Sequence, residues 1–245
     1  MRGSLINVRT RRGRDACVTT PAAGQPPPHT GPVAPHYSVH EIEARMLVEF
    51  ETVRNGLALA VEAALAGDAA AAQVLIDRRS ALQARHSELH SRLLSTIALQ
   101  WPVGGELRLA IALLHVNDRI ERIGTQCTQI AELSRALSPA HAPSPAQLRC
   151  LGSMARLAQD QLRDAETIFA DRHYDGPWRS FEQDLQIVEH DRLWFDVAVN
   201  GPGATSREVA FLVAMIARAL ERIGDNAVDI ARQASFVATG TFGAT

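Results

Sequence analysis

The chain has 245 residues, of which 46% are hydrophobic and only 5% aromatic, a composition that suits close-packed helices better than sheets. All 25 basic residues are arginine, and 27 acidic residues bring the formal charge to −2, which excludes a broadly basic surface for nucleic acid. The 3 cysteines form neither a disulfide framework nor a zinc-ligand spacing, and no apolar run is long enough to span a membrane.

Residues 1–37 are predicted to form a disordered tail. This segment is rich in arginine at its start, and six of the 12 prolines of the chain lie between Pro21 and Pro35. Such a composition cannot bury enough apolar surface to offset the entropy of ordering. We expect a disordered extension, or a start site assigned too early, rather than an arm that touches a membrane or an acidic partner. No apolar run follows the arginines, so we do not expect a secretory signal.

Three long helices are predicted in the first half, over residues 38–67, 68–100 and 104–138. The first starts at a capping box and ends at a glycine, and an aspartate can cap the second helix directly afterwards. A glycine pair opens the third. The residues that carry these signals are Ser38, Glu41, Gly67, Asp68, Gly104 and Gly105.

The second half repeats this plan, with helices predicted over residues 144–173, 177–199 and 205–239. Ser144 is followed by a proline at the first helical position and by Gln147 three residues on, which is a typical helix start. The glycines and prolines near residues 176 and 202 break the chain between these helices.

A four-residue repeat links the two halves. The segment Glu-Arg-Ile-Gly at 121–124 returns letter for letter at 221–224, in the last predicted helix of each half. A repeat at equivalent places in two similar halves indicates an internal duplication. We therefore predict an all-α fold of two tandem three-helix bundles, residues 38–139 and 144–239, with six long antiparallel helices and short connections.

The sequence of residues 220–231, LERIGDNAVDIA, is very similar to the ERIGDHAVNIA segment of the PhoU family of phosphate-uptake regulators. Residues 121–131 form a weaker copy, and Trp101-Pro102 ahead of Glu106-Leu107-Arg108 also resembles the family pattern. The resemblance covers about residues 39–238 and implies the same tandem bundles.

By this resemblance the protein is a cytoplasmic regulator and not an enzyme. It implies an adaptor that restrains phosphate-starvation signalling through a phosphate-sensing histidine kinase and the ATPase subunit of the phosphate ABC transporter. The resemblance also implies a homodimer that reaches the membrane only through its partners. Arg122 and Arg222 are the candidate partner-binding residues. The alternative for these arginines is ion pairing with the adjacent glutamates.

Carboxylates four residues apart on a helix share one face, and clustered carboxylates are ligands for hard cations. The resemblance implies bound divalent or ferric ions, such as Fe, Zn, Mn or Mg, at acidic pairs of this spacing. The alternative is an ordinary solvated face, because Arg218, Arg222 and Arg232 lie close to these acids in sequence. The candidate ligands of the second half are Glu221, Asp225, Asp229, Asp160 and Asp164.

The first half keeps fewer candidate ligands. Thr125 and Gln129 stand where the second half has Asp225 and Asp229, and apolar residues stand at the positions equivalent to Asp160 and Asp164. Only Asp118 and Glu121 remain, so we predict metal binding mainly by the second half.

Two other readings compete with the adaptor. A metal-dependent carboxylate-bundle enzyme would need paired Glu-x-x-His motifs, and the sequence has no such set. A structural helical scaffold without metal is the other alternative. Within the helices we predict that Cys127 is a small core residue, and that Gly124 and Gly224 permit close helix approach or leave room for the arginine side chains. For Asp184 and Asp191 we expect pairing with an arginine of a neighbouring helix, with metal ligation as the alternative.

Overall fold

The computed structural model describes residues 37–137, 142–171 and 206–241, and in these ranges every regular element is an α-helix. The all-α prediction is therefore confirmed for this part of the chain. The predicted helix over 177–199, with Asp184 and Asp191, and the tail over 1–36 lie outside the described residues. The helices are α1 (Val39–Ala66), α2 (Ala69–Gln100), α3 (Gly105–Ala136), α4 (Pro145–Asp171) and α6 (Arg207–Thr239).

The ends of the first two helices follow the local chemistry of the sequence. The backbone N–H of Ser38 donates to Glu41 Oε2 at 2.7 Å, and the Glu41 N–H donates back to Ser38 Oγ at 3.2 Å. Gly67 ends α1 with φ 69°, a left-handed conformation that favours glycine. Asp68 Oδ1 then accepts hydrogen bonds from the first turn of α2, so two residues suffice to reverse the chain. These predictions are confirmed.

The described helices of the second half also start where the sequence predicts. Ser144 and Gln147 exchange hydrogen bonds of 2.8 and 3.3 Å, which is the capping-box arrangement at the start of α4. Ser206 Oγ accepts from the backbone N–H of Val209 at 3.3 Å and caps α6. The third helix ends at Ala136, two residues before the predicted end.

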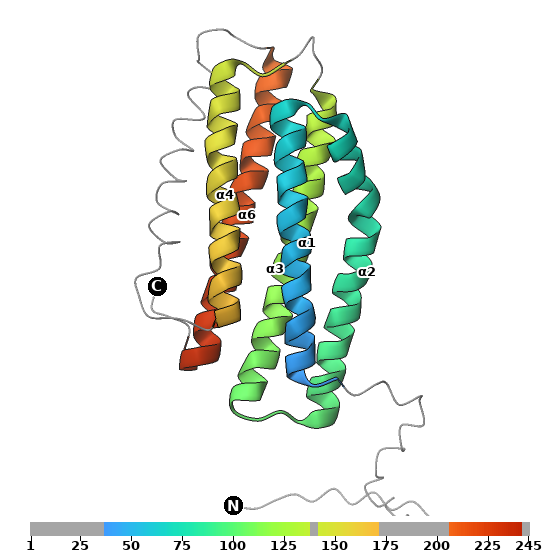
Figure 1. The fold of residues 1–245 in the computed structure, drawn as a ribbon, viewed down its shortest axis with the longest axis vertical. Helices are drawn as coiled ribbons and strands as arrows, with labels where there is room; N and C mark the ends of the chain where they lie inside the picture. The colour runs from blue at the N-terminus through green and yellow to red at the C-terminus, as the bar shows by residue number, and fades with distance from the viewer. Residues whose placement is uncertain (1–36, 138–141, 172–205, 242–245) are drawn as a thin grey trace, which may run out of the picture. The chain divides into compact units, whose positions relative to one another are not determined.

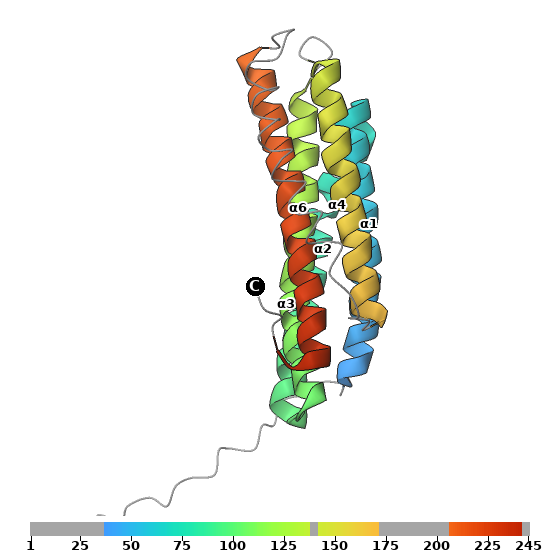
Figure 2. The same cartoon turned by 90° about the vertical axis from the view of Figure 1, so that its left-hand side faces the viewer.

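Helices α1 and α3 lie in the middle of the described bundle, with α2 on one side and α4 and α6 on the other (Figure 1). The two halves pack together through α3 with α6 and through α1 with α4, as the turned view also shows (Figure 2). The chain colours show that α3 and α6 run in opposite directions, and so do α1 and α4 (Figure 1). Equivalent helices of the two halves therefore meet antiparallel.

Small and branched apolar side chains form one continuous core across both halves. The apolar faces predicted for α4 and α6 are buried, and Val53 and Leu57 of α1 are 2% and 0% exposed. Phe50 of α1 meets Phe169 of α4 with ring centroids 5.9 Å apart, an aromatic contact that joins the halves. The predicted inward residues found buried are Leu212, Ile216, Ile223, Ala227, Ile230, Leu151, Ala155, Leu162 and Phe169. Within the described ranges, no helix has both the length and the hydropathy needed to span a bilayer.

Candidate functional site

The two ERIG segments meet in space. They lie on α3 and α6, the helix pair with the most extensive contact between the halves, and both contribute to a groove with a volume of about 530 Å³. Because the two helices are antiparallel, residues before the motif on α3 lie opposite residues after the motif on α6. The groove is lined by Arg119, Arg122, Gln126, Arg222, Asp225, Asn226 and Asp229.

Arg119 joins the two sides of this groove. Its Nη2 lies 3.1 Å from Asp229 Oδ2, and its Nη1 donates to Asn226 Oδ1 at 3.4 Å. Asn226 is 8% exposed and donates through Nδ2 to the backbone carbonyl of Arg222 at 2.6 Å. One arginine of the first half therefore holds two polar side chains of the second half in place. The sequence interpretation missed Arg119, because only the pairing of α3 with α6 gives it a partner.

The predicted partner-binding residues Arg122 and Arg222 are both exposed and both line the groove. Arginine side chains present several N–H donors in a plane and bind carboxylate or phosphate groups well. Gln126, which also lines the groove, has a buried Oε1 without a hydrogen-bond partner. The groove thus offers two accessible arginine side chains, and the Oε1 of Gln126 as an acceptor without a partner, to a ligand or a partner protein.

The acidic stripe of α6 is neutralised by arginines along its own helix and from α3. Glu221 pairs with Arg218, and Asp229 lies between Arg232, at 3.1 Å, and Arg119. Asp225 is exposed and lines the groove. This arrangement is the ion-paired face that the neighbouring arginines indicated as the alternative to a metal site.

The other predicted ligands lie on α4 and α3. On α4, Asp160 pairs with Arg163 at 2.9 Å, and Asp164 is half-buried. On α3, Glu121 accepts a hydrogen bond from Thr125 Oγ1 at 3.1 Å. Among the described residues, the α4 and α6 acids supply no group of three ligand atoms within 4.8 Å of one another. Metal binding by these acids stays a prediction, because residues 172–205 lie outside the described ranges.

Asp118 has a different environment, between two histidines of α2. Its Oδ1 lies 3.1 Å from His86 Nε2 and 3.8 Å from His90 Nδ1. Sequence reasoning proposed Asp118 as a ligand but missed both histidines. Their spacing of four residues was the available signal, since it places both rings on one face of a helix.

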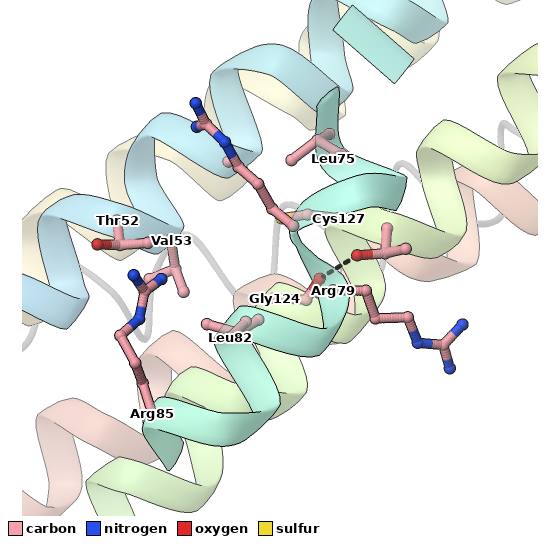
Figure 3. Close-up of a pocket in the computed structure, with 11 residues that line it drawn as sticks. Thr52, Val53, Leu75, Arg79, Leu82, Arg85, Gly124 and Cys127 are labelled. Atoms are coloured by element: carbon pink, nitrogen blue, oxygen red, sulfur yellow. Dashed lines mark hydrogen bonds between the residues drawn. The ribbon is translucent and has the colours of Figure 1, made fainter. Parts of the chain in front are cut away.

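A second, smaller hollow lies between α1, α2 and α3 in the first half (Figure 3). Its floor contains Gly124 and Cys127 of α3, and Arg79 and Arg85 lie at the α2 side. Cys127 is fully buried, and burial raises the pKa of its thiol to about 12. The prediction that Cys127 is a core residue is confirmed, and such a thiol is a poor nucleophile or metal ligand at neutral pH.

The family model described as "PhoU domain" matches the chain twice, over residues 48–134 and 151–234. The chain belongs to the PhoU family. One ERIG segment lies in each matched PhoU domain, so the groove is formed where the two domain copies of this PhoU protein meet.

Curated PhoU proteins from several bacteria are similar along most of their length. The chain is 24% identical over 207 residues to the phosphate-specific transport system accessory protein PhoU homolog 1 of Mycobacterium leprae, covering 84% of this chain and 93% of that protein. It is 28% identical over 176 residues to the PhoU homolog of Caulobacter vibrioides, covering 71% of this chain and 76% of that protein.

Solved PhoU structures share the fold. The crystal structure of the phosphate transport system regulatory protein PhoU from Streptococcus pneumoniae matches with a TM-score of 0.75 at 20% identity, covering 84% of this chain and 98% of that one. PhoU from Pseudomonas aeruginosa matches with a TM-score of 0.68 at 19% identity, covering 83% and 98%. The prediction of a tandem PhoU helical bundle is confirmed.

Proposed function

We propose that this PhoU protein regulates phosphate uptake and phosphate-starvation signalling as a cytoplasmic, non-enzymatic adaptor. Membership of the PhoU family supports this role, since the similar curated proteins are named accessory proteins of a phosphate-specific transport system. The proposed partners are a phosphate-sensing histidine kinase and the ATPase subunit of a phosphate ABC transporter, and the proposed assembly is a homodimer.

The observation that carries the proposal is the position of the two ERIG arginines. Arg122 and Arg222 come from separate halves and are exposed in one groove. Arg119 joins the two sides of the same groove by bonding Asp229 and Asn226. Two cations in one groove can bind an acidic partner surface together.

The test reverses the charge of both arginines and measures partner capture. Arg122→Glu/Arg222→Glu protein should retain much less kinase and ATPase in a pull-down than the wild type. Arg156→Glu is the control, because Arg156 is an exposed arginine of α4 away from the groove. Equal capture by all three proteins would remove the groove from the partner interface.

A deletion strain tests the regulatory role itself. Loss of the gene should release phosphate-regulated genes from repression in phosphate-rich medium, and the charge-reversed variant should fail to restore repression. If the strain without the gene represses normally, the regulator proposal is wrong. If wild-type protein restores repression but captures neither partner, a structural scaffold becomes the better description.

Metal binding by the second-half carboxylates is a separate proposal. Metal binding is supported by the presence of Asp225 and Asp229 in one groove. It is opposed by the arginines paired with Asp229 and Glu221, because a metal ion would have to displace these arginines. Metal analysis of tag-free protein beside Glu221→Ala/Asp225→Ala protein decides between the two. Equal trace metal in both would end the proposal.

A further inference from the structure

Two histidines and an aspartate come together between α2 and α3, away from the ERIG groove. Their ligand atoms, one each from His86, His90 and Asp118, all lie within 4.8 Å of one another, and among the described residues no other such group of three is found. We propose that this cluster binds a transition-metal ion of the zinc type and thereby joins α2 to α3. The inference does not depend on the proposed adaptor role.

The distances suit a small ion. His86 Nε2 lies 3.1 Å and His90 Nδ1 lies 3.8 Å from the same oxygen, Asp118 Oδ1. Tetrahedral zinc holds nitrogen and oxygen ligands at about 2.0–2.2 Å, which places two ligand atoms roughly 3.3–3.5 Å apart. Small side-chain rotations would therefore bring all three atoms onto one ion.

The hydrogen bonds of the cluster leave one nitrogen unexplained. A hydrogen bond between His86 and Asp118 is an ordinary contact between helices and needs no second histidine. His90 Nδ1 is nevertheless buried without a hydrogen-bond partner, and at 3.8 Å it is too far from Asp118 to form one. Buried polar atoms normally have partners. A shared cation would supply the missing partner of His90.

A hydrogen bond next to the cluster positions α2 against α3. Asn117, 1% exposed, donates through Nδ2 to the backbone carbonyl of His86 at 3.0 Å and so fixes this turn of α2 against α3. The side chains of His90 and Asp118 remain 40% and 46% exposed. The cluster therefore borders solvent, and once the His90 ring has rotated toward an ion, water can complete the coordination.

The ligand types select the class of metal. Two imidazoles and one carboxylate suit zinc, cobalt, nickel or copper, whereas magnesium and calcium prefer oxygen ligands alone. The acid nearest to the pair in sequence, Glu88, forms an ion pair with Arg92 on α2. The ligands come from α2 and α3, so a bound ion would tie these two helices together.

The experiment uses the full chain without a histidine tag, stripped with a chelator. Zn²⁺ is titrated in competition with a chromogenic chelator, and Co²⁺ is added in parallel to read the coordination from its visible absorption. The wild type should bind one Zn²⁺ at this site, and His90→Ala and Asp118→Asn should each weaken that binding at least tenfold. Added Zn²⁺ should also raise the melting temperature of the wild type but not of these variants.

Two controls separate this site from other surfaces. His115→Ala removes an exposed histidine of α3 outside the cluster and should bind Zn²⁺ like the wild type. Glu221→Gln/Asp225→Asn alters the second-half carboxylates and should also leave this binding unchanged. Circular dichroism establishes that each variant is folded. The proposal is overturned if His90→Ala and Asp118→Asn bind Zn²⁺ as tightly as the wild type, or if His115→Ala weakens binding equally.

Discussion

Gly124 allows α2 to lie close to α3, and this contact supports a sharp test. A Cβ atom at position 124 would lie 2.0 Å from Leu82 Cδ2 and 3.2 Å from its Cγ (Figure 3). Carbon atoms in contact are normally about 3.5–4.0 Å apart, so Leu82 would have to rotate or the helices would have to separate. Overpacking of this kind costs about 1–3 kcal/mol, whereas replacing a helical glycine with alanine gains about 1 kcal/mol. Gly124→Ala should therefore destabilise the protein by roughly 0–2 kcal/mol.

The matched control is Gly56→Ala in the interior of α1. There the added Cβ would meet Leu75 Cδ2 at 3.6 Å, which is an ordinary contact. Gly56→Ala should then keep the stability gained by replacing a helical glycine with alanine, and its free energy of unfolding should rise by about 1 kcal/mol. Urea denaturation of both variants measures the contrast.

A double-mutant cycle with Leu82→Ala isolates the contact. In the Leu82→Ala background the clash is absent, so Gly124→Ala should now stabilise the protein as Gly56→Ala does. The difference between the two backgrounds should be about 1–3 kcal/mol, which is the size of the overpacking cost. If Gly124→Ala has the same effect in both backgrounds, the close approach is not the reason for this glycine.

Three further predictions concern ionisation and capping. Burial raises the pKa of Glu49 above its usual 4.5, although Arg85 opposes the shift. The stability that Glu49 contributes is therefore full at acid pH and falls as pH rises through the pKa of Glu49 in the folded protein. Unfolding curves between about pH 4 and pH 7 should therefore show the wild type losing stability relative to Glu49→Gln, and parallel profiles would contradict this. Cys127, with its pKa raised to about 12, should resist iodoacetamide in native protein and react only after unfolding, as mass spectrometry can show; rapid native labelling would refute its burial. Ser38→Ala removes the capping box with Glu41 and should lower the free energy of unfolding by about 1 kcal/mol, whereas Ser38→Asp should not.

The helices could be predicted because their signals are local. Ser38, Asp68 and Ser206 cap helices through bonds to residues two or three positions away, so neighbouring sequence letters suffice to place each start. The buried faces of α4 and α6 followed from periodicity for the same reason. Capping and periodicity depend on one segment at a time.

The site was only partly predictable because it depends on which helices meet. The ERIG repeat pointed to Arg122 and Arg222 but not to the ion pair of Arg119 with Asp229, since these two residues are far apart in the chain. The same limit hid the contact of His86 with Asp118, which requires the register between α2 and α3. The ion pairs of Glu221 with Arg218 and of Asp229 with Arg232 were foreseeable because each pair lies three residues apart on one helix, so the ion-paired alternative could be stated from the sequence.

The antiparallel meeting of α3 and α6 bears on how the duplicated protein arose. The α3 helix packs against α6, its counterpart from the other copy. A single-repeat ancestor would have left the face of this contact open to water, and a second identical chain could cover it with the same two-fold geometry. Gene fusion would then have turned an encounter between molecules into a contact within one molecule. Within one chain, a substitution on the α3 side of this contact has to suit the α6 side as well.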